Sequence, residues 1–311
     1  MFPFIVNPAA KSWHSKAYAE KIREALDEAG IENEFLYTEA PGMTGTLAGR
    51  FTQTQNPEIK QLGLIGGDGT LNELVNGLPE DPLPPLFYIP YGSGNDFARG
   101  FQLPVTETNG PEMAVKAASL KPRTVDIGRL SVNGGQPSRF IVSGGIGFDA
   151  AVCFDMLHNN VKKKLNRLHL GFLSYLVLGI KNMFGCPLAN GTLVLDDGEQ
   201  TIPLKKLAFL SAHNLPYEGG GFFFGPKASA QDGLIDICAV TARNHLRFIV
   251  CLFGSLFKGR HIRMKGVYYF QCRKAELTLD TPLDIHTDGE VHEKSARVSF
   301  EVDPAKIRIL S

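Results

Sequence analysis

Apolar positions near the start of the chain fall into two patterns. Residues 4–6 form a short apolar run that predicts a buried strand. Residues 15–29 instead show apolar side chains at a spacing of about four positions, with polar residues filling the other face. Their apolar members include Tyr18, Ile22 and Leu26. This repeat predicts an amphipathic helix.

The alternation of strand-like and helix-like segments continues to about Val125. Such alternation is typical of an α/β domain built on a parallel sheet. In chain order the pattern predicts an extended segment near residues 35–38, a helix over 45–52, a strand over 61–65, a helix over 70–78, a strand over 86–90 and a helix over 97–101.

After Val125 the pattern changes to short strands separated by Gly, Pro and Asp-Gly turns. This pattern is typical of a mostly antiparallel β domain. We therefore predict two domains, an α/β domain over residues 1–125 and a β-rich domain over residues 126–311. Strands of the second domain are predicted over residues 128–132, 140–144, 191–195, 205–211, 234–240, 267–273 and 275–279.

Length and charge narrow the classes of function. A chain of 311 residues is long for one compact core, and two domains that share a cleft would suit an enzyme with two substrates. Lysine and arginine total 32, as do aspartate and glutamate, so the formal net charge is zero. Because there is no strong basic field, we expect no nucleic-acid partner.

Cysteines and apolar segments indicate a cytoplasmic protein. The five cysteines are odd in number, dispersed and without a C-x-x-C pair, which favours small core residues over zinc ligands or disulfides. The apolar run at the N-terminus ends too soon for a signal peptide. The longest apolar stretch, residues 168–184, carries polar and charged residues and falls short of the roughly 18 residues of a membrane-spanning helix.

Candidate chemistry begins with a strand, a glycine-rich turn and a helix, which occur in this order twice. Glycines let backbone N–H groups approach an anion, and a helix N-terminus adds partial positive charge. Turns that end neighbouring parallel strands lie side by side, at the edge where ligands bind in open α/β sheets. The two turns read Gly66-Gly67-Asp68-Gly69-Thr70 and Gly92-Ser93-Gly94-Asn95-Asp96.

Asp68 stands inside the first turn, where it would repel a phosphate unless a divalent cation lay between them. It therefore suggests Mg²⁺. The alternative is an ordinary tight turn in which Asp68 is a capping residue. Neither the dinucleotide fingerprint G-x-G-x-x-G nor a Walker A motif is present.

Longer strings extend both turns and make them more specific. Together with four further blocks, they resemble the soluble diacylglycerol and lipid kinase family over nearly the whole chain. The strings are Leu71-Asn72-Glu73-Leu74-Val75-Asn76-Gly77 and Phe97-Ala98-Arg99, and the blocks are Asn7-Pro8-Ala9-Ala10, Gly219-Gly220-Gly221-Phe222, residues 226–236 and Asp288-Gly289-Glu290.

The resemblance implies a nucleotide domain related to those of NAD kinases and 6-phosphofructokinases, followed by a β-sandwich domain whose last residues could return to the first. ATP and a lipid would meet between the two. Asn95 and Asp96 would brace the second turn. The implied ATP site consists of Asn7, Pro8, Ala9, Ala10, Lys11, Thr38, Gly66, Gly67, Asp68, Gly69, Thr70, Leu71, Asn72, Glu73 and Ser93.

The chain departs from the family directly after Ala10. Members usually continue with glycine and a basic, glycine-rich stretch, whereas this chain reads Lys11-Ser12-Trp13-His14-Ser15-Lys16. The departure leaves open how the terminal phosphates are neutralised. Lys11 and Lys16 are the candidates.

In similar enzymes the segment that matches residues 226–236 holds a structural Mg²⁺. The resemblance points here to the carboxylate of Asp232 with main-chain oxygens of Ser229 and Leu234. The alternative is an Asp-Gly hairpin turn without a metal.

Phosphoryl transfer needs a base near the attacking hydroxyl and neutralisation of charge on the phosphates. By resemblance, Glu290 would accept the proton of the lipid hydroxyl and Asp68 would act on the phosphates through Mg²⁺. In the related sphingosine kinases the aspartate of the glycine turn is itself assigned as the base, so the two roles could be exchanged. The alternative for Glu290 is a solvent-exposed residue at a hairpin tip between Ile285 and Val291.

Two segments suit an anionic membrane surface because basic residues flank apolar ones. Residues 161–167 are rich in lysine and precede the apolar stretch 168–184, and residues 248–257 are followed by Lys258, Arg260, His261, Arg263 and Lys265. Either segment could instead be a core helix with a solvated basic end.

These observations predict an ATP- and Mg²⁺-dependent lipid kinase that associates peripherally with membranes, with diacylglycerol as the expected acceptor and phosphatidate as the product. Monoacylglycerol, phosphatidylglycerol, a sphingoid base or a polyprenol are alternative acceptors. From another class, a nucleotide-responsive lipid-binding module without turnover is the alternative. The β-rich domain could also pair with a second copy of itself.

Overall fold

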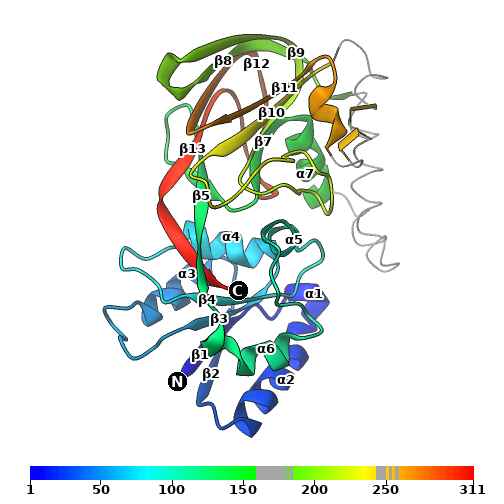
Figure 1. The fold of residues 1–311 in the computed structure, drawn as a ribbon. Coiled ribbons are helices and arrows are strands. Elements are labelled where there is room, and N and C mark those ends of the chain that lie inside the picture. Colours follow the sequence, from blue (N-terminus) through cyan, green and yellow to red (C-terminus); the bar gives the residue numbers. More distant parts are fainter. Residues whose placement is uncertain (159–178, 180–181, 183–184, 243–249, 252–253, 256–258) are drawn as a thin grey trace. The chain divides into compact units, whose positions relative to one another are not determined.

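A computed structural model describes residues 1–158, 179, 182, 185–242, 250–251, 254–255 and 259–311. The chain divides into two compact units, the first comprising Met1–Val125 with Ala305–Ser311 and the second Asp126–Pro304. Within the described residues, no helix is long and apolar enough to cross a membrane. Figure 1 shows the elements of each unit.

The first unit is built on a sheet in which four strand pairs are parallel. β1 pairs with β2 and β3, and β3 pairs with β4. The end of β13 joins the same sheet, where Ile309 lies opposite Leu86. The other strands are β1 (Phe2–Val6), β2 (Asn33–Tyr37), β3 (Leu62–Gly66) and β4 (Leu86–Pro90).

Helices follow most of these strands, as expected for an α/β unit. The helix predicted over residues 15–29 is confirmed and ends at Glu28, whereas the one predicted over 45–52 is a short α-helix that continues as a 3₁₀ turn. The helices are α1 (Ala10–Trp13), α2 (Ser15–Glu28), α3 (Met43–Ala48), α4 (Asp68–Asn76), α5 (Asp96–Phe101) and α6 (Gly110–Val115), with 3₁₀ turns η1 (Gly49–Phe51) and η2 (Ala117–Ser119).

The core of the first unit forms where the apolar face of α2 packs on the sheet. Ile22 and Leu26 are fully buried there beside Phe4. The Phe4 ring stacks on Phe35 at 4.7 Å between centroids. Burial of such side chains stabilises a fold by roughly 1.5–3 kcal/mol each. This core fixes the strand ends that carry the glycine turns.

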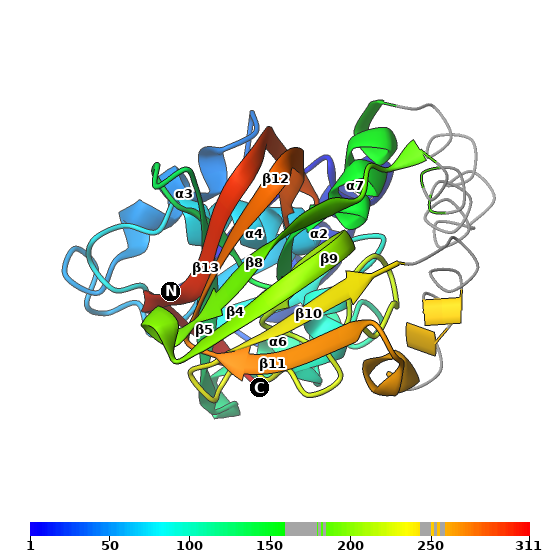
Figure 2. The ribbon, with the colours of Figure 1, turned by 90° about the horizontal axis from the view of Figure 1, so that it is seen from above.

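The second unit is mostly antiparallel, as its sequence pattern predicts. The order β11-β10-β9-β7-β12-β13 runs through antiparallel pairs, and β8 pairs with β9 and β12. Figure 2 shows β8 to β11 side by side. Its elements are β5 (Pro122–Val132), β6 (Ser138–Phe140), β7 (Ser143–Gly147), α7 (Phe148–His158), β8 (Ala189–Leu195), η3 (Asp196–Gly198), β9 (Gln200–His213), β10 (Ile235–Thr241), η4 (Arg260–Arg263), β11 (Val267–Cys272), β12 (Lys274–Thr287) and β13 (Glu290–Leu310).

One predicted strand, over residues 140–144, is divided in the structure. The backbone N–H groups of Ile141, Val142 and Ser143 all donate to the carboxylate of Asp288. This side chain takes the place of a neighbouring strand at that point, so β6 ends before it and β7 begins after it.

The cysteines match their predicted role in part. Cys238, Cys251 and Cys272 are buried, Cys153 and Cys186 are half-buried, and none of the five forms a disulfide. Burial is the main cause that raises the pKa of Cys251 and of Cys272 to about 12. These two are therefore inert core residues near neutral pH.

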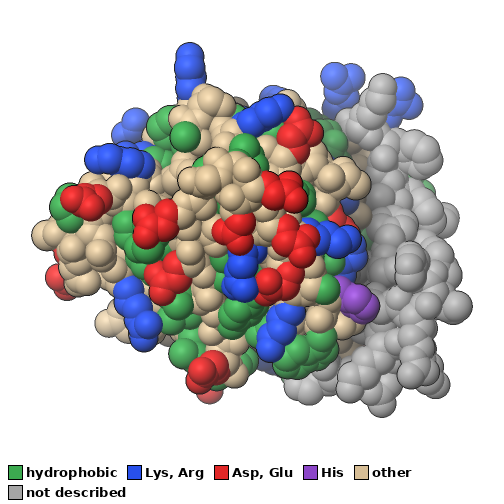
Figure 3. Space-filling view, turned by 90° about the horizontal axis from the view of Figure 1, so that it is seen from below, with side chains coloured by type: hydrophobic (Ala, Val, Ile, Leu, Met, Phe, Trp, Pro, Cys, Tyr) green, Lys and Arg blue, Asp and Glu red, His purple; other side chains and the backbone are tan. Residues whose placement is uncertain are grey.

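The segments predicted to meet a membrane lie almost entirely outside the described residues, since residues 161–167, most of 168–184 and most of 248–257 belong to that part. Among the basic residues that follow, His261 is fully buried, so its assignment to a membrane surface is wrong. Figure 3 shows acidic and basic side chains interspersed on one face of the molecule. This mixture agrees with the equal numbers of the two signs.

Candidate functional site

The two glycine turns lie in direct backbone contact. β3 and β4 are neighbouring parallel strands, and Gly66 at the end of one lies opposite Pro90 at the end of the other. A Cβ atom added at Gly92 would lie 2.6 Å from the Cα of Gly67. Glycine is therefore required at Gly92 by close approach, and the predicted side-by-side placement of the turns is confirmed.

Asp68 ties the first turn to the helix that follows the second. Its Oδ2 accepts a hydrogen bond from the N–H of Asp96 at 2.9 Å, and its Oδ1 accepts one from the N–H of Phe97 at 3.2 Å. A carboxylate at these first N–H groups of α5 is favourable because the groups carry partial positive charge. Asp68 is thus a capping residue, but one that caps the helix of the other turn.

Asn95 holds the second turn closed from within. Its backbone is left-handed, with φ of 52°, a conformation that asparagine tolerates better than most residues. The side-chain Oδ1 accepts the N–H of Gly92 at 2.9 Å, and Nδ2 donates to the carbonyl of Pro90 at 3.4 Å. Next to it, Asp96 pairs with Arg99 at 2.5 Å.

Asn7 connects the end of β1 to the first turn. Its Nδ2 donates to Oγ1 of Thr70 at 2.9 Å, and its Oδ1 accepts the N–H of Ala9 at 3.0 Å. The hydroxyl of Ser15 donates to the carbonyl of Asn7 at 2.7 Å, which fixes the start of α2. Thr38 follows β2 and donates its N–H to Val6 at 3.0 Å. The predicted nucleotide residues Asn7, Thr38 and Thr70 thus gather at the carboxyl ends of adjacent strands.

The departure from the family pattern has an unusual backbone. Lys11, Ser12 and Trp13 have φ of 48°, 58° and 71°, so three consecutive residues other than glycine are left-handed. The ammonium group of Lys11 forms an ion pair with Glu107 and lies 5.0 Å from the ring centroid of Tyr91. A phosphate bound by Lys11 would have to compete with this carboxylate.

Three of the predicted nucleotide residues turn their side chains into the unit itself. Leu71 is a fully buried core residue, so only its backbone could serve a ligand. Asn72 is buried and accepts a hydrogen bond from Asn76 Nδ2 at 3.1 Å. Glu73 accepts the hydroxyl of Thr44 at 2.6 Å, which links α3 to α4.

Lys16, the other candidate cation, lies 5.7 Å from the ring centroid of Tyr37. Ser93 is exposed at the second turn.

The loop predicted to hold a structural metal is anchored by an aspartate that sequence reasoning missed. Asp126 donates its N–H to Ala230 at 2.7 Å and accepts the N–H of Gly233 on Oδ2 at 2.8 Å. Asp232 accepts the N–H of Leu234 at 3.0 Å. Burial, and then the charge of Asp126, raise the pKa of Asp232. Asp126 belongs to no motif, so no local signal marks it.

A divalent cation fits this loop chemically, because carboxylate and main-chain oxygens are the ligands that Mg²⁺ accepts. Such an ion would also neutralise the facing charges of Asp232 and Asp126. Within the described residues, no group of three or more His, Cys, Asp and Glu side chains is placed to hold a metal. The main-chain oxygens of Ser229 and Leu234 would therefore have to complete the set.

In the second unit, Asp288 and Gly289 form the two-residue turn between β12 and β13, with φ of 46° and 88°. Both residues are left-handed, which is the backbone of a type I′ turn and the reason for the Asp-Gly sequence. Asp288 accepts the N–H groups of Val142 and Ser143 at 2.9 Å each. Glu290 follows the turn, opposite Thr287, and is exposed. The hairpin-tip position weighed for Glu290 is therefore the observed one.

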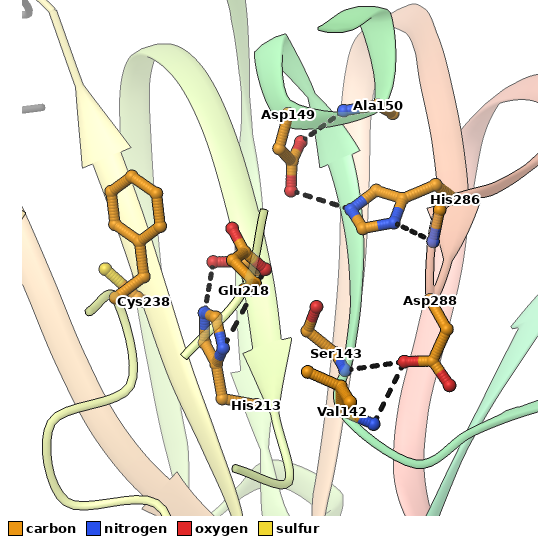
Figure 4. A network of polar contacts seen from close by, with 12 residues as sticks. Val142, Ser143, Asp149, Ala150, His213, Glu218, Cys238, His286 and Asp288 are labelled. Atoms are coloured by element: carbon orange, nitrogen blue, oxygen red, sulfur yellow. Dashed lines mark hydrogen bonds and ion pairs between the residues drawn. The ribbon is translucent and has the colours of Figure 1, made fainter. Parts of the chain in front are cut away.

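A buried histidine and aspartate lie behind this turn, as Figure 4 shows. Nε2 of His286 lies 3.2 Å from Oδ2 of Asp149. Burial opposes protonation of the imidazole, but the hydrogen bond and the charge of Asp149 outweigh it and raise the pKa of His286. The two residues are 137 positions apart in the chain, so no sequence motif joins them.

A second polar pair lies nearby on β9 and in the loop after it (Figure 4). Nδ1 of His213 is 3.9 Å from Oε2 of Glu218, and its Nε2 is 2.8 Å from the hydroxyl of Ser211. Complete burial lowers the pKa of His213 to about 3, so it is neutral at ordinary pH. Glu218 comes directly before the block of glycines at Gly219 that was matched to the family.

Comparisons with known proteins agree with both units. Residues 2–130 match the family model of the diacylglycerol kinase catalytic domain. Residues 146–311 match that of the YegS C-terminal NAD kinase beta sandwich-like domain. A Bacillus subtilis protein provisionally named lipid kinase YtlR is 28% identical over 310 residues, which cover 98% of each chain.

Solved structures show the same fold. A Bacillus anthracis protein, provisionally titled a diacylglycerol kinase, has a TM-score of 0.74 at 22% identity, covering 99% of this chain and 96% of its own. An NAD kinase from Archaeoglobus fulgidus, solved in complex with ATP, has a TM-score of 0.53 at 12% identity, covering 100% and 94%. The chain therefore belongs to the family of lipid kinases that join a diacylglycerol kinase catalytic domain to a YegS-type C-terminal domain.

Proposed function

We propose that this protein transfers the γ-phosphoryl group of ATP to a lipid hydroxyl, with diacylglycerol as the acceptor and phosphatidate as the product. The family supports a lipid kinase, and the printed names of several relatives specify diacylglycerol. The acceptor, ATP and Mg²⁺ are parts of the proposal.

The observation that carries the nucleotide part is the contact between the two glycine turns. Gly67 and Gly92 are in close backbone contact, and the carboxylate of Asp68 joins the two turns by accepting the N–H of Asp96. A preorganised backbone of this kind is what phosphoryl transfer requires, since positioning and electrostatics supply most of the catalysis. The NAD kinase of similar fold was solved in complex with ATP, which supports ATP as the nucleotide of the proposal.

In the proposed reaction the lipid hydroxyl attacks the γ-phosphorus. A new bond forms between the lipid oxygen and the phosphorus, the bond from that phosphorus to the β-bridging oxygen breaks, and ADP leaves. The hydroxyl proton passes to the carboxylate of Glu290, whose exposed position on the hairpin suits a base that must reach a substrate. Asp68 is the alternative base.

Mg²⁺ would neutralise the phosphate charges of the bound nucleotide. Asp68 would supply the carboxylate of the first turn for this ion, while its oxygens keep the hydrogen bonds from the N–H groups of Asp96 and Phe97. The loop at Asp232 would hold a second, structural ion. In that loop the ion would keep Asp232 ionised, against the burial that favours its neutral form.

A diacylglycerol acceptor resides in a bilayer, so the proposal includes peripheral association with a membrane. Two segments that join apolar to basic residues, 161–184 and 248–265, support it through their composition. Anionic vesicles should therefore stimulate turnover more than neutral vesicles that carry the same diacylglycerol.

The proposal is tested by incubating purified protein with Mg²⁺, γ-labelled ATP and diacylglycerol in mixed micelles. Label should enter the lipid fraction, and Glu290→Gln should abolish this while its thermal unfolding stays unchanged. A protein that binds ATP but labels no member of a broad lipid panel would instead be a regulatory module. Label in a sphingoid base, phosphatidylglycerol or a polyprenol, but not in diacylglycerol, would replace the acceptor.

A further inference from the structure

Behind the hairpin that carries Glu290, two side chains and two backbone N–H groups form a continuous chain of hydrogen bonds. Asp149 stands in the first turn of α7, and its Oδ1 accepts the N–H of Ala150 at 2.8 Å. Its other oxygen faces Nε2 of His286 at 3.2 Å. Nδ1 of the same imidazole accepts the N–H of Gly289 at 3.4 Å.

The sequence of β7 makes room for this chain. Gly145 lies directly opposite His286 in the antiparallel pair of β7 and β12. A Cβ atom at Gly145 would lie 1.9 Å from Oδ2 of Asp149 and 2.9 Å from Nε2 of His286. A side chain at Gly145 would displace Asp149 and His286. The contact between these two residues therefore depends on the glycine.

The arrangement also fixes the tautomer of the imidazole. Because Asp149 accepts only, Nε2 must carry the proton, which leaves the lone pair of Nδ1 for the N–H of Gly289. His286 is 3% exposed, so water does not compete well for either nitrogen. The tip of the hairpin is thereby held on one side by His286, and on the other by the N–H groups of Val142 and Ser143, which donate to Asp288.

We propose that His286, oriented by Asp149, is a positioning residue that sets the hairpin tip and with it the carboxylate of Glu290 for proton abstraction. This inference rests on the proposed function, because it assigns a task to the group behind Glu290. Residues that orient a reacting group commonly change its efficiency by about 10- to 100-fold when they are removed.

Two substitutions separate the two nitrogens of the imidazole. Asparagine places an oxygen near the position of Nδ1, so His286→Asn keeps an acceptor for Gly289 and loses the contact to Asp149. Glutamine reaches the position of Nε2, so His286→Gln keeps the contact to Asp149 and loses the acceptor. We expect kcat to fall by roughly 10- to 100-fold in His286→Gln. In His286→Asn the loss of kcat should be at least tenfold smaller, and KM for ATP should be unchanged in both variants.

The pH profile gives a second, independent readout. Protonated His286 carries N–H on both nitrogens and cannot accept from Gly289, so kcat should fall as the pH drops through its pKa. The charged or titratable groups that face it are Asp149 on α7, Glu218 after β9, His213 on β9, Asp288 on its own hairpin and His292 on β13. Since Asp149 raises the pKa of His286, Asp149→Asn should move the acidic limb to lower pH.

The outcomes are distinguishable. Equal kcat in the two His286 variants, or an acidic limb that does not move in Asp149→Asn, would overturn the inference. Glu290→Gln serves as the reference in the same assay, with thermal unfolding as the check on folding. If Glu290→Gln is inactive and the His286 variants are equal, only the positioning role fails. Full turnover in Glu290→Gln would contradict the role of Glu290 as the base.

Discussion

The carboxylate of Asp68 accepts a hydrogen bond from the backbone N–H of Asp96, 28 residues further along the chain, at 2.9 Å. This bond joins the two glycine turns through an acidic side chain at a helix N-terminus. The same carboxylate would meet Mg²⁺ in the proposed reaction. Asp68 therefore has a structural task, and the proposed reaction would add a chemical one at the same position.

Asp68→Asn separates these tasks only in part, because the amide keeps the size but loses the charge. Hydrogen bonds to charged groups contribute about 1.5–3 kcal/mol, so we expect the free energy of unfolding to fall by about 1–2 kcal/mol. We expect turnover to fall by about 100-fold or more, since the charge that would hold Mg²⁺ is gone. Urea unfolding and lipid labelling measure the two effects.

Glu112→Gln on α6 is the control, because its exposed pair with Lys116 should leave stability unchanged. Turnover of Asp68→Asn near that of the unaltered protein would contradict the assignment of Asp68 to phosphate and metal.

Gly92→Ala tests the contact between the turns. Its Cβ would lie 2.6 Å from backbone of Gly67, which cannot move aside as a flexible side chain could. Overpacking of this kind costs about 1–3 kcal/mol, so thermal unfolding should shift down accordingly.

Gly69→Ala is the matched control for Gly92→Ala, because nothing lies within 4 Å of its Cβ and it sits in α4. Alanine is the better helix former by about 1 kcal/mol, so this variant should be as stable as the unaltered protein or more so. Equal destabilisation of the two variants would mean that the contact between the turns is not the cause.

Glu107→Gln tests whether Lys11 serves the nucleotide. The Lys11–Glu107 pair is about 40% exposed on each side, so it is a weak competitor for a phosphate. Removing the carboxylate should therefore lower KM for ATP by no more than about fivefold, whereas Lys11→Met should raise it. Initial rates at varied ATP measure both. An unchanged KM in Lys11→Met would show that another cation neutralises the phosphates.

Asp236 predicts a pH dependence of stability. Burial is the main cause that raises its pKa to about 6, although Tyr269 donates to its Oδ1 at 2.6 Å. The folded protein holds the proton of Asp236 more tightly than the unfolded chain does. The contribution of this proton to the free energy of unfolding is therefore complete below pH of about 4 and is lost as the pH rises through about 6. This contribution to the free energy of unfolding is at most about 3 kcal/mol.

In Asp236→Asn the loss of unfolding free energy between pH 4 and 6 should become smaller, as measured by urea unfolding at several pH values. An identical pH profile in the variant would mean that Asp236 is ionised throughout the range.

Much of the first unit could be predicted because its strands are fully buried and its helices amphipathic. The strand predicted over residues 86–90 has the bounds of β4. By contrast, β13 was not predicted, since charged residues and Pro304 interrupt its apolar pattern. Proline normally argues against the interior of a strand. Here it stands at the boundary between the two compact units.

The residues of the candidate site also fall into those that could be predicted from the sequence and those that could not. Gly67, Asp68 and Asn95 could be found because local turn chemistry marks them. Asp126 and the pair of Asp149 and His286 could not. The contacts that join Asp126 to Gly233 and Asn214, and Asp149 to His286, span 88 residues or more of the chain, and only the folded sheet brings these residues together. His286 stands two residues before a matched block, yet isolated histidines in strands carry no signal of their own.

A diacylglycerol kinase activity is tested most directly by the mass of the product that the protein forms from a total lipid extract with ATP and Mg²⁺. We expect diacylglycerol to be consumed, phosphatidate with the same acyl chains to appear, and Glu290→Gln to form none. Well-folded protein that binds ATP but leaves every lipid unphosphorylated would contradict it.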